Sequence, residues 1–89
     1  MSMKDLDVKK RFGLAIRSLR GKSGISQEEL AWRAELHRTY VSDIERGGRN
    51  PSLLSIERLA KALNVSFPTL FQPLEDPEKP VAKIAACKK

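Results

Sequence analysis

The chain has 89 residues, a length that allows one domain with a modest hydrophobic core and excludes two. Hydrophobic residues make up 40% of it, and Leu, Ala, Glu, Lys and Arg dominate, a composition that excludes a disordered chain and favours helices. The 17 Lys and Arg residues exceed the 11 Asp and Glu residues, giving a net charge of +6, which suits a polyanionic partner but also occurs in small proteins without one.

The first predicted helix spans Leu6 to Arg20, and two glycines, Gly21 and Gly24, end it. Apolar residues recur in this segment every three or four positions, so they form one stripe that is expected to face the core. Basic residues lie off the stripe. The stripe consists of Val8, Phe12, Ala15, Ile16 and Leu19.

The second predicted helix runs from Gln27 to about Ala34. It begins with a capping box, in which the Ser26 hydroxyl accepts a first-turn amide and the Glu29 carboxylate reaches back. A helix of two turns needs packing to be stable. Trp32 falls between the inward positions, and we expect it to pack against the first helix or the tail rather than to lie near a ligand. The inward positions are Leu30, Ala31 and Ala34.

The third predicted helix begins near His37 and ends at Gly47-Gly48, with Leu36, Val41 and Ile44 facing inward. Only three residues, 35–37, separate it from the second helix. A short link with a change of direction is typical of a helix-turn-helix, which we place at about residues 26–46.

Two further helices complete the predicted domain. Ser52 caps a helix over Leu53 to Leu63, and Ser66 caps a short one over Phe67 to Phe71. We therefore predict an all-α, compact five-helix bundle over residues 1–72. Three prolines in eight residues predict a flexible or weakly helical tail over residues 73–89. The expected inward face of the fourth helix is Leu54, Ile56, Leu59, Ala60 and Leu63.

Several motifs recur in a recognisable order and spacing. They are SQEELA at 26–31, RTYVSDIERG at 38–47, RNPS at 49–52 and LAKALNVS at 59–66. The stretch from Ser26 to Phe71 resembles the phage repressor, Cro and XRE family of helix-turn-helix transcriptional regulators. Within that family it is similar to the controller proteins of restriction–modification systems. The resemblance implies a lambda-repressor-like domain that binds operator DNA as a homodimer.

The resemblance also implies that the segment from His37 to Glu45 enters the major groove. The guanidinium of Arg38 suits guanine O6 and N7, while Thr39 and Ser42 suit a base edge or a phosphate. Asp43 either accepts from a cytosine amine or orients a neighbouring arginine, Arg38 or Arg46. Each of these side chains has the alternative of being only a solvated surface group.

The same resemblance implies backbone contacts around that helix. Gln27 is expected to bond a phosphate and to brace the third helix, with the free amides of its own first turn as further donors. Arg46, Arg49 and Asn50 follow the third helix along the DNA backbone, or else Arg46 pairs with an acid and the other two shape the turn. His37 departs from the family, which usually has a small capping residue there. Its ring either reaches a phosphate or is only a poor cap.

A domain of this size reads few base pairs, so we expect a symmetric dimer on a palindrome with half-sites about 34 Å apart. The end of the domain is more apolar than a five-residue helix requires. The alternative is that these residues only close the core of one protomer. The expected interface residues are Val65, Phe67, Leu70 and Phe71.

Other function classes find little support in the sequence. One His and one Cys, 50 residues apart, offer no catalytic pair or metal spacing, no glycine-rich phosphate loop is present, and we expect no enzyme activity and no cofactor. Cys87 has no partner for an internal disulfide, and no signal peptide or membrane span is evident, so a cytoplasmic protein is expected. The alternative function is an antitoxin or protein-interaction module of the same fold, which should carry apolar residues where Arg38, Thr39, Ser42 and Asp43 stand.

Overall fold

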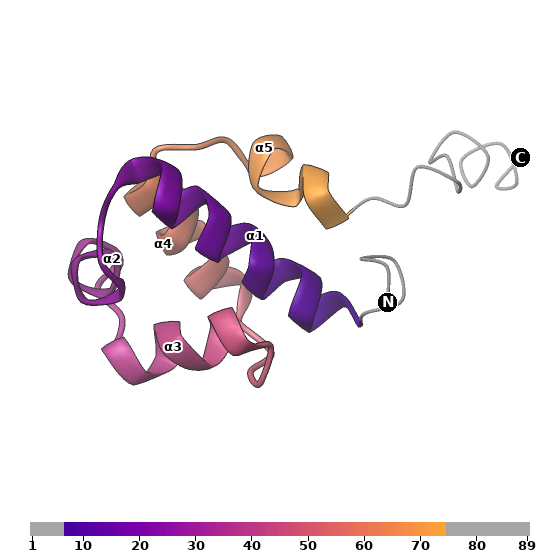
Figure 1. Cartoon of the computed structure of the whole chain (residues 1–89), viewed down its shortest axis with the longest axis horizontal. Coiled ribbons are helices and arrows are strands. Elements are labelled where there is room, and N and C mark those ends of the chain that lie inside the picture. Colours follow the sequence, from indigo (N-terminus) through magenta and orange to yellow (C-terminus); the bar gives the residue numbers. More distant parts are fainter. Residues whose placement is uncertain (1–6, 75–89) are drawn as a thin grey trace, which may run out of the picture.

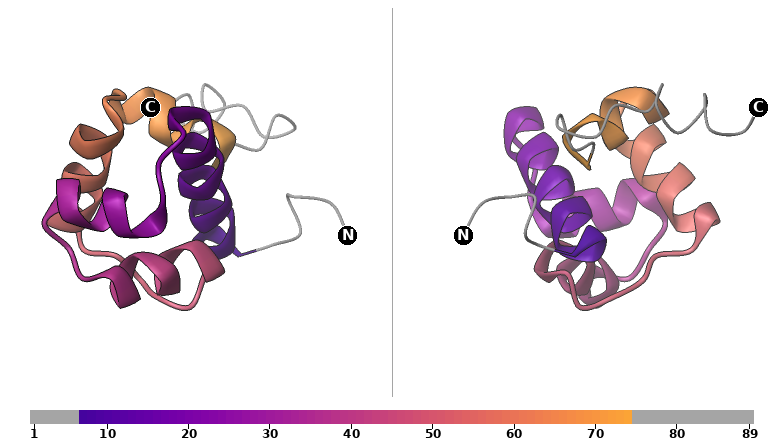
Figure 2. Two further views of the ribbon diagram at one scale, coloured as in Figure 1. Left: turned by 60° about the vertical axis from the view of Figure 1, so that its left-hand side comes forward. Right: turned by 90° about the vertical axis from the view of Figure 1, so that its right-hand side faces the viewer.

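The computed structural model describes residues 7–74, which form five α-helices followed by a single turn of 3-10 helix (Figure 1). This confirms the predicted all-α, five-helix bundle. In Figures 1 and 2, α3 lies at one end of the bundle and α5 at the opposite end. The elements are α1 Val8–Ser23, α2 Gln27–Ala34, α3 Arg38–Arg46, α4 Leu53–Leu63, α5 Phe67–Phe71 and η2 Gln72–Leu74.

Local capping fixes most helix ends. Four helices begin at a residue whose side chain accepts the amide three positions on, which satisfies a donor without a partner inside the helix. Only the hydroxyl half of the expected capping box on α2 forms, because Glu29 binds Arg33 at 2.8 Å instead. The four capping residues are Asp7, Ser26, Ser52 and Ser66.

The first helix is longer than its sequence predicts. It continues through Gly21 and ends at Ser23, three residues beyond the predicted end at Arg20. A glycine inside a helix costs only about 1 kcal/mol relative to alanine, so Gly21 does not stop it. Gly24 does, because its left-handed conformation (φ +71°) turns the chain out of the helix.

The core is built from one face of each helix. The predicted inward residues of α2 are all buried, as are Val41 and Ile44 of α3. Val8 and Leu54 were predicted to face inward and are exposed instead. Trp32 was expected to pack against the first helix or the tail; packing against the first helix is wrong, since its side chain is 77% exposed, and the tail lies outside the described residues. The cluster comprises Phe12, Ile16, Leu30, Ala31, Ala34, Val41, Ile44, Leu59, Ala60, Leu63 and Leu70.

The folded body extends slightly past the predicted boundary at residue 72. Leu74 packs against the core, and its carbonyl oxygen accepts a hydrogen bond of 2.7 Å from Arg11 Nη1 on α1. The 3-10 turn is thereby held against the first helix. The rest of the predicted tail, residues 75–89 with Cys87, lies outside the described residues.

The third helix crosses the first at close range. A Cβ atom on Gly13 would lie 2.3 Å from the carbonyl oxygen of Ile44 and 2.7 Å from that of Glu45. Both neighbours are backbone atoms of α3 and cannot rotate away. Only glycine at position 13 therefore allows α3 to approach α1 in this way.

We expect Gly13→Ala to lower the free energy of unfolding by about 1–3 kcal/mol, because the new methyl group pushes α3 away from α1. Gly21→Ala is the matched control, since its Cβ would meet no atom of the described residues within 4 Å. This second change should raise stability by about 0.5–1 kcal/mol. Urea unfolding followed by circular dichroism measures both, and equal effects would contradict the close crossing.

Candidate nucleic-acid interface

A largely buried ion pair attaches α3 to α1. Arg20 on α1 donates from Nε to Glu45 Oε2 at 2.6 Å and from Nη2 to Glu45 Oε1 at 3.0 Å. The Glu45 side chain is 3% exposed. The hydrogen bonds to the Glu45 carboxylate raise the pKa of the Arg20 guanidinium above its ordinary value. The pair fixes the end of α3 relative to α1.

Gln27, the first residue of α2, joins this pair. Its Nε2 donates to Glu45 Oε1 at 3.0 Å, while Arg20 Nη1 donates to the Ile25 carbonyl oxygen just before α2. The expected brace between Gln27 and the third helix is therefore present as a direct hydrogen bond. Its expected phosphate contact stays a prediction.

Five of the predicted DNA-binding residues surround one shallow hollow. It has a volume of about 310 Å³ and lies between the start of α2 and the outer face of α3. Arginine, glutamine and hydroxyl groups line it, so it presents hydrogen-bond donors and acceptors rather than an apolar surface. The lining residues are Gln27, Arg38, Thr39, Ser42 and Arg46.

Asp43 connects this hollow to the loop that follows α3. Its two oxygens accept from Nη2 of Arg46 and, at 3.1 Å, from Nη2 of Arg49. Arg46 Nη1 also donates to Ser42 Oγ at 2.6 Å, and the Arg49 guanidinium lies 4.8 Å from the centre of the Tyr40 ring. Of the roles open to Asp43, orienting Arg46 is the one that these contacts support.

His37 and Asn50 complete the predicted set, and both are exposed. His37 occupies the N-cap position of α3, but its ring makes no capping hydrogen bond within residues 7–74. Asn50 lies in the loop between α3 and α4, next to Arg49. The expected phosphate contacts of both residues stay predictions.

Sequence reasoning missed three residues that shape this surface: Arg20, Tyr40 and Glu45. Tyr40 contacts Arg49 and also accepts a hydrogen bond of 3.4 Å from the Ser52 amide, so it supports the loop after α3. Glu45 lies four residues after the inward Val41 and therefore on the same helix face. An acid at that position is a signal for a buried basic partner.

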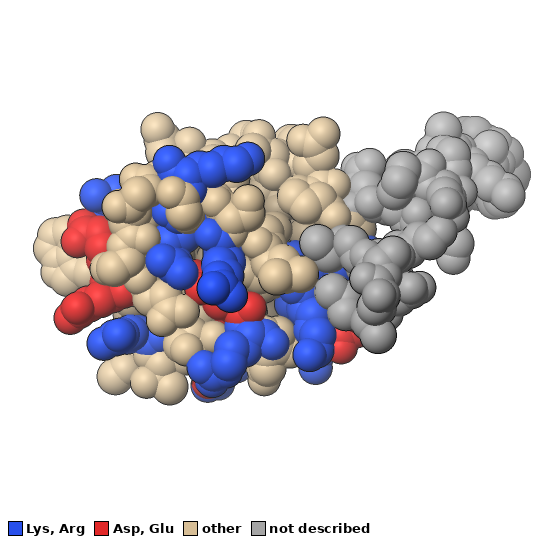
Figure 3. Space-filling view, in the orientation of Figure 1, with Lys and Arg blue, Asp and Glu red and all other residues tan. Residues whose placement is uncertain are grey.

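Charge is unevenly distributed over the surface. Figure 3 shows Lys and Arg side chains over α1 and α3, whereas acidic side chains gather over α2 at the left of the view. A polyanion therefore meets positive charge around this helix.

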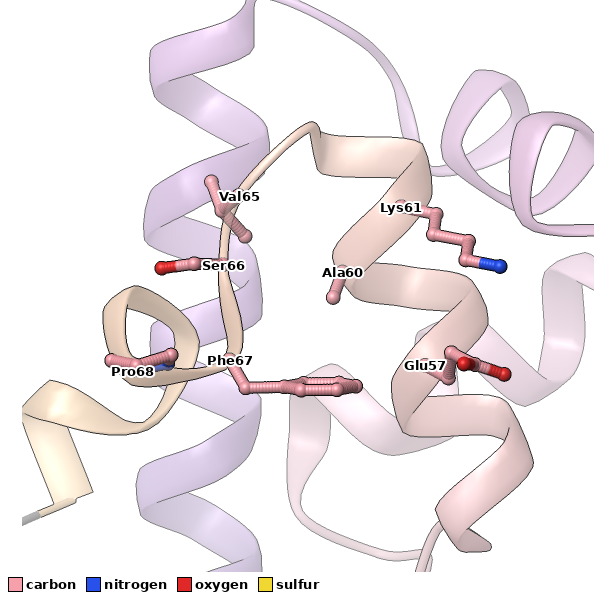
Figure 4. Close-up of a pocket in the computed structure, with 7 residues that line it drawn as sticks. All are labelled: Glu57, Ala60, Lys61, Val65, Ser66, Phe67 and Pro68. Atoms are coloured by element: carbon pink, nitrogen blue, oxygen red, sulfur yellow. The ribbon is translucent and has the colours of Figure 1, made fainter.

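The predicted dimer residues differ in how far they are exposed. Phe67 is 45% exposed, and Val65 is half-buried beside it. Figure 4 shows the Phe67 ring extending from the start of α5 toward α4, across a cavity of about 370 Å³. Leu70 is fully buried in the protomer, and Phe71 packs between Phe12 and Phe67 at centroid distances of 6.0 and 6.5 Å.

Two leucines at the start of α4 enlarge the apolar surface. Leu53 is 79% exposed and Leu54 is 54% exposed, and together with Phe67 they line a second groove. We call Leu53, Leu54, Val65 and Phe67 the α4–α5 patch. The apolar surface available to a partner thus lies partly on α4, and Leu70 contributes none of it.

Within residues 7–74, no group of three or more His, Cys, Asp or Glu side chains is placed to hold a metal ion. In the same part of the chain, every helix is too short or too polar to cross a bilayer.

Comparison with known proteins identifies the family. A family model described as helix-turn-helix matches residues 16–70. Control protein C.BamHI from Bacillus amyloliquefaciens is 58% identical over 55 residues, which cover 61% of this chain and 68% of that protein. The chain belongs to this helix-turn-helix family. The resemblance inferred from the sequence motifs is thereby confirmed.

Solved structures of helix-turn-helix controllers share the fold. The restriction-modification controller protein C.AhdI from Aeromonas hydrophila matches with a TM-score of 0.68 and 47% identity, covering 70% of this chain and 94% of that one. The controller protein C.Esp1396I, solved as a tetramer in complex with its natural 35-base-pair operator, matches with a TM-score of 0.72 and 36% identity. That match covers 78% of this chain and 91% of the other.

We expect Arg20→Ala to lower the free energy of unfolding by about 3–5 kcal/mol, because it leaves the Glu45 carboxylate buried without its cation. The double change Arg20→Met with Glu45→Met should recover most of this loss, since no buried charge then remains. Urea titrations of the single and double variants measure the difference. A loss below about 1 kcal/mol in Arg20→Ala would contradict the role assigned to the pair.

Proposed function

We propose that this chain is a transcriptional regulator of the restriction–modification controller type, which binds operator double-stranded DNA as a homodimer. The observation that carries the proposal is the hollow lined by Gln27, Arg38, Thr39, Ser42 and Arg46, at the junction of α2 and α3. Relatives that are control proteins, and a controller solved on its operator, support the same function.

The outer face of α3 is proposed to read bases in the major groove. Arg38 stands at the first position of α3 and is exposed, so its guanidinium is free to bond guanine O6 and N7. Thr39 and Ser42 line the same hollow and offer hydroxyl groups to a base edge or phosphate. Regulation then follows from occupancy of an operator near a promoter.

The flanking groups are proposed to hold the phosphate backbone. Gln27 and the free amides at the start of α2 lie on one side of the hollow. Arg46, Arg49 and Asn50 lie on the other side, along the end of α3 and the loop after it. His37 is exposed just before α3 and is proposed to contact the backbone on the side of Arg38.

The α4–α5 patch is proposed as the surface between the two protomers. It combines the most exposed leucine of the described residues, Leu53, with the protruding Phe67 ring. Exposed apolar surface of this kind favours a protein partner. Two protomers joined here would offer two copies of α3 to one palindrome. A cytoplasmic location is proposed as well, because operator DNA lies in that compartment.

Proteins of this family are DNA-binding regulators rather than an enzyme class. The alternative of an antitoxin or protein-interaction module would need an apolar face on α3. That face instead carries arginine and hydroxyl groups, which favours DNA. Selection of binding sites from random duplexes tests the proposal, and it fails if no motif is enriched.

We expect Arg38→Ala to weaken binding to the selected duplex by about 1–3 kcal/mol and to relax the preference at one base position. Repeated selection and fluorescence anisotropy measure these two effects. Arg33→Ala is the matched control, because it also removes one exposed arginine but lies outside the hollow. A loss of equal size on every sequence would show that Arg38 holds phosphate rather than a base.

We expect Leu53→Glu to convert the dimer to a monomer at micromolar concentration, since a buried unpaired carboxylate opposes association. Leu53 opens α4, where a negative charge suits the helix dipole, so the fold of the protomer should persist. Analytical ultracentrifugation measures the mass. Val8→Glu, which alters an exposed aliphatic residue outside the patch, should leave the dimer intact. A dimer in Leu53→Glu would place the interface elsewhere.

A further inference from the structure

Asp43 holds two arginines of the proposed phosphate-binding surface at the same time. One carboxylate oxygen accepts from Arg46 and the other accepts from Arg49 at 3.1 Å. Ser42 and the Tyr40 ring give these arginines second partners, so both guanidiniums have a defined position without DNA. Half of the positive charge that they offer a phosphate is thereby neutralised by the protein itself.

These contacts are open to exchange with DNA. The Arg46 and Arg49 side chains are 66% and 46% exposed, whereas that of Asp43 is 23% exposed. Since exposed ion pairs are weak, a phosphate can replace Asp43 at either guanidinium. The carboxylate would then stand unpaired among phosphates, which repel it.

The extent of this repulsion depends on the duplex. Each guanidinium has five donors, so an arginine can bond a phosphate with its free edge while Asp43 keeps the other edge. When α3 lies in the major groove of its preferred site, the phosphates of that duplex lie next to Arg46 and Arg49 in the positions where Asp43 holds them. A duplex that docks differently draws them away from Asp43 and leaves the carboxylate exposed to the phosphate charge.

We propose that Asp43 is a specificity-determining residue that acts against non-specific DNA. By holding Arg46 and Arg49 it weakens binding to duplexes that lack the preferred site, and it leaves binding to the preferred site nearly unchanged. Discrimination here comes from a repulsive element and needs no base contact by Asp43. The inference rests on the proposed function, because it requires a preferred duplex.

The test is the substitution Asp43→Asn, which keeps the shape of the side chain and removes its charge. Anisotropy titrations give Kd for the selected duplex and for a scrambled duplex of equal length at several salt concentrations. We expect binding to the scrambled duplex to strengthen about three- to tenfold and binding to the selected one to change less than about twofold. The salt dependence of scrambled-duplex binding should also steepen, because two freed arginines displace more counterions.

Glu29→Gln is the matched control. It also removes one carboxylate and an exposed ion pair, that of Glu29 with Arg33 on α2, outside the hollow. It should shift both affinities by the same factor. An equal shift on both duplexes in Asp43→Asn would overturn the inference, since Asp43 would then act through net charge alone. Loss of preference at a single base position would also overturn it, because Asp43 would then read a base.

Two further variants allow the inference to be tested even if Asp43→Asn does not fold. Asp43→Ser gives the same comparison with a smaller neutral side chain, should the amide crowd the guanidiniums and unfold the protein. In an Arg49→Gln background the effect of Asp43→Asn should shrink, and an unchanged effect would overturn the part assigned to Arg49. If the unaltered protein prefers no duplex, the proposed function fails together with the inference. If it prefers one and Asp43→Asn keeps the full preference, only the inference fails.

Discussion

The ion pair between Arg20 and Glu45 is the interaction on which the proposed DNA-binding surface depends. A nine-residue helix such as α3 is not stable alone and takes its position from its neighbours. The pair ties the end of α3 to α1, and Gln27 ties the start of α2 to the same carboxylate. Desolvation offsets much of the attraction in a buried pair, so its main effect is to fix geometry rather than to add stability. Direct readout requires such fixed geometry, because bidentate contacts tolerate little displacement.

Local signals predicted the elements well. Ser26, Ser52 and Ser66 cap α2, α4 and α5, and the bounds of these helices agree with the prediction because a cap acts within one turn. The predicted end of α1 was wrong because two glycines were treated alike, although only Gly24 adopts the left-handed conformation. Trp32 was misplaced because its exposure depends on which helices surround α2, and no local pattern contains that information.

Only the exposed residues of the candidate site could be predicted from the sequence. Residues on the outer face of α3, such as Arg38 and Thr39, follow from helical periodicity and from the family motifs. The partners of Asp43 could not be predicted in this way, because Arg46 and Arg49 are both close to it along the chain. Only the folded loop shows that both arginines bind its carboxylate. Glu45 was overlooked since its partner lies 25 residues away on another helix.

The helix period divides α3 between two tasks. Val41, Ile44 and Glu45 face the core or the ion pair, while Arg38 and Thr39 are exposed on the outer face. Outward residues can therefore change without disturbing the inward ones. Such a domain can acquire a new operator by a few substitutions while its stability and folding stay the same.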